Sequence, residues 1–329
     1  MTAHIQPDSW LQFMGQEYLE TFIRDGGSSV KFAVALDEQA NQYVSDGFSK
    51  IAIQRGYLVA RVSASDTKVH MMEEVFFRTA EQLSWGDLSR QVIRALAETA
   101  GYRWPAGESA QSAPALYERL AAENNVDSQM LLLDLKRQIG DHVFKERNLA
   151  KDFRVAMTHL CLAQLSGGSD GEHTVKVLTD WLTGRNKTIS AVMPYHIFRK
   201  IDRSTARYFF ESMTHWIRCA GHAGLVLLMD TSRLLVPRDP QDRSLFYSKA
   251  AVLDAYELLR QFIDGADRVS SYLMIVMPSF AFLEDLSRGL SAYEALKFRV
   301  FDEIRDKVLV NPMASLVRIA SNNGRQHDS

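Results

Sequence analysis

Two short apolar runs that flank one helical stretch limit the folds open to this chain more than any other feature. The runs are residues 30–35 (VKFAVA) and 57–62 (YLVARV), each of the length expected for a buried strand. Residues 39–54 between them have helical spacing and end before Arg55-Gly56. Strand, helix and strand within about 33 residues form a βαβ unit with a right-handed crossover. The pattern therefore predicts an α/β fold built on a parallel sheet.

Two further strands are expected in the second half of the chain. Residues 225–230 (LVLLMD) form an apolar run that ends in an acid, and residues 271–277 (SYLMIVM) end before Pro278. Helical spacing dominates elsewhere, whereas residues 103–114 and the glycine-rich residues 166–171 have the composition of loops. Besides residues 39–54, the helical stretches are residues 9–24, 68–102, 115–165, 174–182, 204–220 and 245–263.

The order of these elements predicts one interrupted core with an insertion. Residues 1–66 form the N-terminal part of the core, and residues 67–187 a helical insertion. Residues 188–318 complete the core with the acidic strand and C-terminal helices, and residues 319–329 are expected to be a flexible tail. The insertion accounts for the length of 329 residues without a second fold.

The composition is that of an ordinary soluble globular protein and excludes several classes. The 38 basic and 40 acidic residues leave a net charge of −2, and 46% of the chain is hydrophobic. The longest apolar runs are far shorter than the roughly 18 to 20 residues of a membrane span, and residues 1–10 show no secretory signal. Cys161 and Cys219 belong to no metal-binding spacing. We therefore expect a cytoplasmic protein that neither spans a membrane nor coats nucleic acid by bulk charge.

The positions that follow the first strand keep the frame of the P-loop, G-x-x-x-x-G-K-[ST], without its chemistry. That motif uses glycines to wrap backbone N–H groups around phosphates, a lysine to neutralise their charge, and a hydroxyl to hold Mg²⁺. In residues 35–42 (ALDEQANQ), alanine replaces both glycines, asparagine the lysine and glutamine the hydroxyl residue. Asp37 and Glu38 add negative charge where the phosphates would lie. The cofactor-binding candidates of this degenerate site are Ala35, Ala40, Asn41 and Gln42, with an unrelated strand-to-helix turn as the alternative.

The acidic strand supplies the second candidate element. In an active ATPase a strand-terminal Asp supports Mg²⁺, and in many families a following Glu polarises the attacking water. Asp230 ends the strand here, but Thr231 follows it and cannot act as a carboxylate base. A simple cap for the next segment is the alternative interpretation of Asp230. Ser279, which follows the strand at residues 271–277, is a weaker candidate for a polar sensor residue.

A series of weaker signatures extends over residues 15–305, and residues 221–230 (GHAGLVLLMD) are the most specific of them. The others are residues 18–32, 56–59, 75–78, 152–156, 181–184, 243–256 and 285–299. In this order they resemble the BREX-type ATP-binding proteins of bacterial anti-phage operons, the BrxC and BrxD family. The resemblance implies an AAA-like P-loop NTPase core, a parallel sheet flanked by helices, with ATP hydrolysis as the family activity.

The resemblance also implies roles for single residues. The family's phosphate-binding glycines, lysine and hydroxyl fall on the four positions given above and are not retained, and of its acidic pair only Asp230 remains. ATP and Mg²⁺ are therefore cofactors only if the altered site still binds them. The histidine spacing predicts no metal site. Arginines that could sense phosphate or bridge subunits are Arg243, Arg288 and Arg299, and of these Arg243 and Arg299 join Asp230 as catalytic candidates.

A separate group of basic residues is a candidate for binding nucleic acid or an acidic partner. Arg199, Arg203 and Arg207 are spaced four residues apart and would form one stripe on a helix. Such a stripe could follow a phosphate backbone, and a solvated helix face is the alternative. Polar residues after the second strand that could line a cleft, or form only a turn, are Ser63, Ser65 and Asp66.

Three functional hypotheses follow. The first is a pseudo-ATPase that holds other proteins of its defence operon, such as a helicase, a TerB-like protein or an active ATPase paralogue. The second is an active ATPase whose site is completed by a neighbouring subunit of a homo-oligomer. The third is a DNA-binding module that uses the arginine stripe. The net charge near zero favours protein partners over nucleic acid.

Overall fold

The computed structural model describes residues 4–106, 115–239, 241–300 and 311–321. The chain divides into two compact units, one formed by residues up to Thr79 with those from His222 onward, and one by Ala80–Gly221. These boundaries lie later in the chain than residues 67 and 188, the positions suggested by the sequence. The reason is that most of α3 (Met72–Ala80) belongs to the first unit and all of α9 (Ala206–Cys219) to the second.

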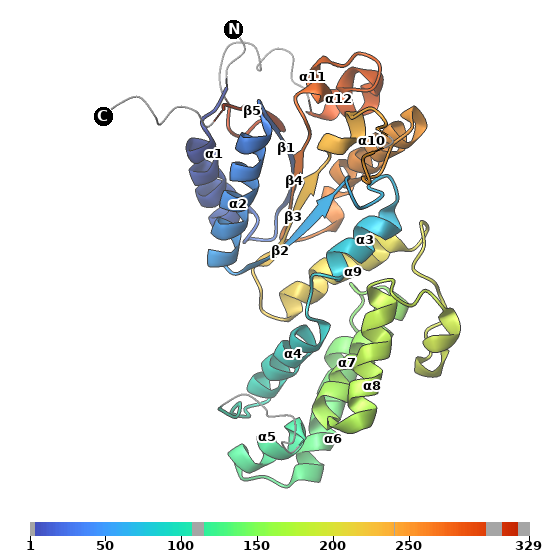
Figure 1. Ribbon diagram of the computed structural model, residues 1–329. Coiled ribbons are helices and arrows are strands. Elements are labelled where there is room, and N and C mark those ends of the chain that lie inside the picture. The colour runs from blue at the N-terminus through green and yellow to red at the C-terminus, as the bar shows by residue number, and fades with distance from the viewer. Residues whose placement is uncertain (1–3, 107–114, 240, 301–310, 322–329) are drawn as a thin grey trace. The chain divides into compact units, whose positions relative to one another are not determined.

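The first unit is built on a five-stranded sheet with the order β2-β3-β4-β1-β5 (Figure 1). Every pair of neighbouring strands is parallel. The sheet confirms the predicted α/β class and is consistent with a P-loop NTPase-like core. The strands are β1 (Ser28–Ala35), β2 (Tyr57–Ser63), β3 (Gly224–Asp230), β4 (Tyr272–Met277) and β5 (Leu316–Ile319).

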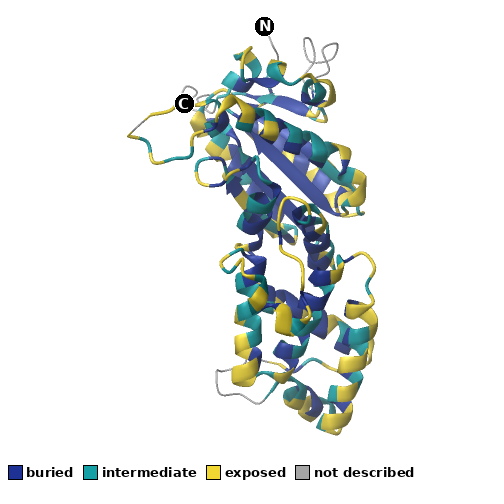
Figure 2. Ribbon diagram, turned by 90° about the vertical axis from the view of Figure 1, so that its right-hand side faces the viewer, coloured by how far each residue is buried: buried dark blue, intermediate teal, exposed yellow. Residues whose placement is uncertain are grey.

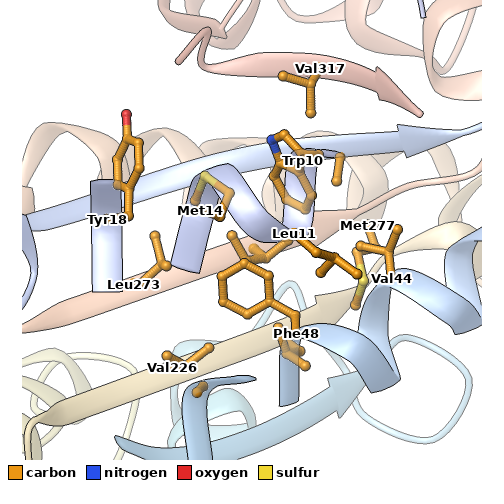
Figure 3. Close-up of a cluster of buried hydrophobic side chains, with 14 of the residues drawn as sticks. Trp10, Leu11, Met14, Tyr18, Val44, Phe48, Val226, Leu273, Met277 and Val317 are labelled. Atoms are coloured by element: carbon orange, nitrogen blue, oxygen red, sulfur yellow. The ribbon is translucent and has the colours of Figure 1, made fainter. Parts of the chain in front are cut away.

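The central strands are continuous apolar runs because helices cover both faces of the sheet. One face packs against α1 (Pro7–Phe13), the π-helix η1 (Met14–Phe22) and α2 (Glu38–Gln54). In this layer the rings of Trp10 and Phe48 lie 5.9 Å apart (Figure 3). The strands are correspondingly dark blue along most of their length in Figure 2, the colour of buried residues.

The other face of the sheet carries an aromatic cluster. Phe32 of β1 stacks on Phe282 of α11 (Ala281–Glu284), with ring centroids 5.8 Å apart. Tyr256 of α10 (Lys249–Asp264) meets Phe282 edge-on at 5.7 Å. The remaining helices of this unit are α12 (Glu294–Val300) and the short 3-10 helices η5 (Ser232–Leu235), η6 (Ala266–Arg268) and η7 (Leu290–Ala292).

The second unit is helical, and its core also centres on aromatic side chains. Phe153 is fully buried and contacts the rings of Trp85 and Phe209 at centroid distances of 5.9 and 5.8 Å. Trp181 in turn meets Phe209 at 5.5 Å. Besides α9, the helices are α4 (Trp85–Thr99), α5 (Leu116–Asn124), α6 (Ser128–Ile139), the π-helix η2 (Gly140–Phe144), α7 (Lys151–Ser166), α8 (Gly168–Leu182), and the 3-10 helices η3 (Ile189–Ala191) and η4 (Met193–Tyr195).

The loop predicted at residues 166–171 is wrong, because α8 begins at Gly168. A single residue, Gly167, makes the turn with φ of 61°. Gly171 lies inside α8, where a Cβ atom would lie 2.7 Å from the carbonyl oxygen of Ala163. Part of the glycine content that suggested a loop instead allows two helices to approach closely.

The predicted flexible tail at residues 319–329 is also wrong at its start. Ile319 is buried in β5 and pairs with Ala35 of β1. Ala320 donates its backbone N–H to Ile5 at 2.9 Å, and the Ser321 hydroxyl donates to Asp37. A strand of four residues gives too short a periodic signal to be recognised among flanking polar residues. Residues 322–329 lie outside the described part of the chain.

The predicted helix at residues 68–102 is two helices, α3 and α4, which are separated by residues 81–84. The indole N–H of Trp85 donates to the Ala80 carbonyl at 3.0 Å and fixes this break. In the parts of the chain that the structure describes, no helix is both long and apolar enough to cross a membrane.

One charged side chain is buried in the sheet. Lys31 of β1 is only 5% exposed, and its ammonium donates to the carbonyl oxygens of Met313 and Ala314 before β5. The same ammonium lies 4.7 Å from the ring centroid of Tyr18. Burial lowers the pKa of Lys31 to about 8, because desolvation disfavours the charged amine.

We expect the replacement Lys31→Met to change how stability depends on pH. Below about pH 8 the lysine is charged in both states, so its burial carries the full desolvation cost. Between pH 8 and 10.5 the unfolded chain binds more protons, so the parent gains about 3 kcal/mol relative to Lys31→Met as pH rises. Denaturant unfolding of both proteins across this window measures the difference. A difference that does not vary with pH would contradict the assignment.

Candidate functional site

The parallel sheet brings the carboxyl ends of all its strands to one edge, where open α/β sheets bind ligands. The register places Ser63 of β2 and Met277 of β4 on either side of Asp230 in β3. Ala35, at the end of β1, is separated from β3 by β4. This edge therefore contains both Asp230 and the first position of the degenerate P-loop, Ala35, and β4 lies between their strands.

Asp230 has hydrogen-bond donors at both carboxylate oxygens. The Ser63 hydroxyl donates to one oxygen at 3.2 Å, and the backbone N–H of Ser232 donates to the other at 2.9 Å. The bond from Ser232 closes an Asx turn, so Asp230 acts as a cap for the segment that follows it, the alternative role given to it above. Asp230 is only partly buried, and a carboxylate has about four lone-pair positions. It therefore caps its own turn and keeps some capacity for a further ligand.

Of the serines predicted to line a cleft, Ser63 contacts Asp230 directly. The hydroxyls of Ser63 and Ser65 are 2.6 Å apart, which links Ser65 to the carboxylate through Ser63. Asp66 points its carboxylate elsewhere, because it pairs with Arg78 at 3.1 Å. Thr231 is 4% exposed and donates its backbone N–H to Met277 at 3.0 Å. A buried threonine at this position provides no carboxylate to activate water.

The connection between β1 and α2 has no room for a phosphate-binding loop. Only two residues, Leu36 and Asp37, separate the strand from the helix. Asp37 is the N-cap of α2, and its carboxylate accepts the backbone N–H of Ala40 at 2.7 Å. The donor hydroxyl of Ser321, together with the Ala40 N–H, lowers the pKa of Asp37. An ionised carboxylate thus occupies the helix end that binds phosphate in nucleotide sites.

The four degenerate motif positions are ordinary parts of this capped helix and its strand. Ala35 is buried in β1, and Ala40 is fully buried in the first turn of α2. The backbone N–H of Asn41 donates to the Asp37 carbonyl at 3.1 Å, an intrahelical bond. The side chain of Gln42 donates to Asp46 one turn further along, at 2.8 Å. None of these contacts is directed at Asp230.

The three candidate arginines have different surroundings. Arg288 donates to the backbone carbonyls of Leu234 and Tyr247, at 3.1 and 2.6 Å, so it ties two loops together. Arg299 forms a paired contact with both carboxylate oxygens of Asp264. Arg243 is exposed, and no ion pair holds it among the residues that the structure describes. Of the three arginines, only Arg243 has no ion pair or hydrogen bond from its guanidinium to the residues that the structure describes.

Arg233, three residues after Asp230 in the chain, is a further functional candidate that the sequence pattern did not indicate. Arg233 lies in η5, donates to the Leu245 carbonyl at 3.1 Å and pairs with Asp242. These contacts fix the loop that follows the acidic strand. Its position three residues after Asp230 is the only sequence signal, because its partners lie about ten residues further along.

The predicted arginine stripe on a helix is wrong. Arg199 and Arg203 precede α9, which begins only at Ala206, and Arg207 alone is helical. Asp202 stops the helix from starting earlier, because its carboxylate accepts the backbone N–H groups of the next residues in a turn. The three arginines therefore share a short segment but no helix face.

The described residues contain no group of three or more His, Cys, Asp or Glu side chains that could hold a metal ion. Burial raises the pKa of the Cys219 thiol to about 11 and that of Cys161 still further. Both thiols are therefore protonated near neutral pH, where only a thiolate is a nucleophile.

Comparison with known families gives one match. The model of a family described as BREX system ATP-binding protein BrxC/D matches residues 106–324, which is more than half of the chain. The matched residues include β3 with Asp230 but begin after β1 and α2, so they do not contain residues 35–42. Searches of curated proteins and of solved structures found no match.

Proposed function

The chain belongs to the BREX system ATP-binding protein BrxC/D family, and we propose that it serves anti-phage defence as a protein that no longer hydrolyses ATP. The observation that carries the proposal is the turn between β1 and α2. Two residues connect these elements, and the carboxylate of Asp37 already caps the helix. The place where a phosphate would bind is thus taken by a negative charge of the protein itself.

Several features of the turn between β1 and α2 act together to disfavour nucleotide binding. A phosphate cradle needs glycines, successive free N–H groups and a lysine. Here alanines occupy the glycine positions, and the N–H of Ala40 already donates to Asp37. Asp37 would repel a polyphosphate, and no lysine lies in residues 35–42 to compensate. At the second motif, Asp230 remains without a neighbouring carboxylate base.

In this proposal the core works as a structural or regulatory partner of other proteins from the same defence operon, in the cytoplasm. A helicase, a TerB-like protein or an active ATPase paralogue are the candidate partners, and homo-oligomers are a further arrangement. Exposed apolar side chains on α6 and η2 support a protein partner. Met130 is 68% exposed, Leu133 64% and Phe144 50%.

Reconstitution tests this partner role. The chain is mixed with each purified protein of its operon, and complexes are separated by size-exclusion chromatography with and without Mg·ATP. We expect a complex that forms without ATP and is lost in the double variant Met130→Glu, Leu133→Glu. Ile53→Glu is the matched control, because Ile53 is 62% exposed on α2 of the other unit. No complex, or one that requires ATP, would contradict the proposal.

A second candidate function, an ATPase completed across a subunit interface, is favoured only by Arg243. This exposed guanidinium could reach a nucleotide held by a neighbouring copy. Such an enzyme would assemble in the presence of Mg·ATP, and Arg243→Ala would prevent the assembly. Light scattering measures the molecular mass with and without nucleotide. The pseudo-ATPase proposal predicts the same mass in both conditions.

A further inference from the structure

Residues 198–208 of the helical unit, here called the aromatic–basic segment, present rings and cations to solvent. Phe198 is 60% exposed and Tyr208 is 59% exposed. The segment is nevertheless anchored, because Ile197 is fully buried and Ile201 is 8% exposed. Phe198 therefore lies next to a buried anchor in the segment between η4 and α9, and Tyr208 lies in the first turn of α9.

The cations of the segment are available to a ligand. Arg199, Lys200 and Arg203 are exposed, and among the described residues no ion pair engages any of them. Arg207 is different, since its guanidinium lies 3.5 Å from Glu211. Arg199, Lys200 and Arg203 thus follow Phe198 by one, two and five residues in the chain.

The one acid of the segment is turned toward the backbone. Asp202 accepts the backbone N–H groups of Ser204 and Thr205 at 3.0 and 3.2 Å, and the Ser204 hydroxyl at 2.7 Å. The Ser204 hydroxyl and these N–H groups lower the pKa of Asp202. The Asp202 carboxylate therefore shapes the turn before α9. It forms no ion pair with the neighbouring cations among the residues that the structure describes.

We propose that the aromatic–basic segment binds single-stranded nucleic acid. Bases stack on Phe198 and Tyr208, while Arg199, Lys200 and Arg203 contact the phosphates. Exposed aromatic rings beside unpaired cations are the elements of single-strand binding surfaces, since every base offers a face for stacking. A purely acidic chain such as polyglutamate could pair with the cations but offers no flat face to stack on the rings. A duplex would not offer free base faces.

This proposal is independent of the pseudo-ATPase role, because it uses no residue of the sheet edge. It also differs from the arginine stripe expected from the sequence. The cations do not lie along one helix, and the two aromatic side chains were not part of that expectation.

Fluorescence anisotropy with the full chain tests the proposal. The probes are fluorescein-labelled dT20 and U20 oligonucleotides, which distinguish DNA from RNA, and a labelled 20-base-pair duplex. We expect Phe198→Ala and Tyr208→Ala each to weaken single-strand binding on the order of tenfold. The double variant Arg199→Ala, Arg203→Ala should reduce the slope of log K against log salt by about 1.4.

Matched substitutions elsewhere in the helical unit serve as controls. Phe144 is 50% exposed on η2, and the exposed Arg94 and Arg137 pair with acids on their own helices. Phe144→Ala and the double variant Arg94→Ala, Arg137→Ala should leave the affinity unchanged. In Phe198→Trp, stacking is retained, so addition of dT20 should quench the new indole fluorescence.

Several results would overturn the proposal. One is the absence of oligonucleotide binding at 50 mM salt with correctly folded protein, as judged by circular dichroism. A second is competition by polyglutamate as effective as that by unlabelled dT20, which would indicate an acidic protein partner. A third is duplex binding as tight as single-strand binding and insensitive to Phe198→Ala.

Discussion

Replacing Gly224 by alanine is expected to lower the free energy of unfolding of the sheet-containing unit by about 4 kcal/mol. Gly224 begins β3 with φ of 144°, a conformation that residues with a side chain rarely adopt. A Cβ atom there would lie 2.0 Å from the carbonyl oxygen of Ser271. That oxygen accepts the backbone N–H of Leu225 at 3.0 Å, so it cannot move away without loosening the start of β3.

A nearby glycine provides the control. Gly221 also has a positive φ, of 89°, but a Cβ atom there meets nothing within 4 Å. Gly221→Ala should therefore cost only the backbone strain, about 1 kcal/mol. Hydrogen exchange of the β3 amides measures the local effect in both variants, and denaturant unfolding the global one. Equal losses in the two variants would show that the contact with Ser271 is not what requires glycine at residue 224.

Replacing Phe153 by alanine is expected to have a comparable effect on the helical unit. Phe153 is fully buried between the rings of Trp85 and Phe209, so truncation leaves a large cavity. Such changes cost about 3–5 kcal/mol. Tryptophan fluorescence during urea unfolding is a suitable probe, because all the tryptophans except Trp10 lie in this unit.

The exposed Phe144 gives the matched comparison. Phe144→Ala removes the same side chain at a position that is 50% exposed, so it should change stability by less than about 0.5 kcal/mol. If both variants unfold at the same urea concentration, the aromatic cluster around Phe153 is not the core of this unit.

Much of the sheet could be predicted from the sequence because four of its strands are short, largely apolar runs. The runs at residues 30–35, 57–62, 225–230 and 271–277 all correspond to strands. The fifth strand, Leu316–Ile319, was missed because four residues do not establish a period. Its place beside β1 depends on pairing across almost the whole chain, which local pattern cannot reveal.

The candidate site was predictable only where it depends on neighbours in sequence. The ends of two apolar runs pointed to Asp230 and Ser63, which are the last residues of β3 and β2. The sequence showed that Asp37 adds charge but not that its carboxylate caps α2 and meets Ser321 from the far end of the chain. The four-residue spacing also placed Arg199 on a helix, wrongly. The turn capped by Asp202, which delays the start of α9 to Ala206, has no periodic pattern by which the sequence could reveal it.

The rate of ATP hydrolysis by the purified chain at millimolar Mg·ATP, compared with that of Asp230→Ala, shows whether the nucleotide site is active. We expect a background rate that is the same for both proteins, and no increase in melting temperature on addition of Mg·ATP. A substantial rate that Asp230→Ala abolishes would contradict this expectation, because Asp230 would then support Mg²⁺ in a working site.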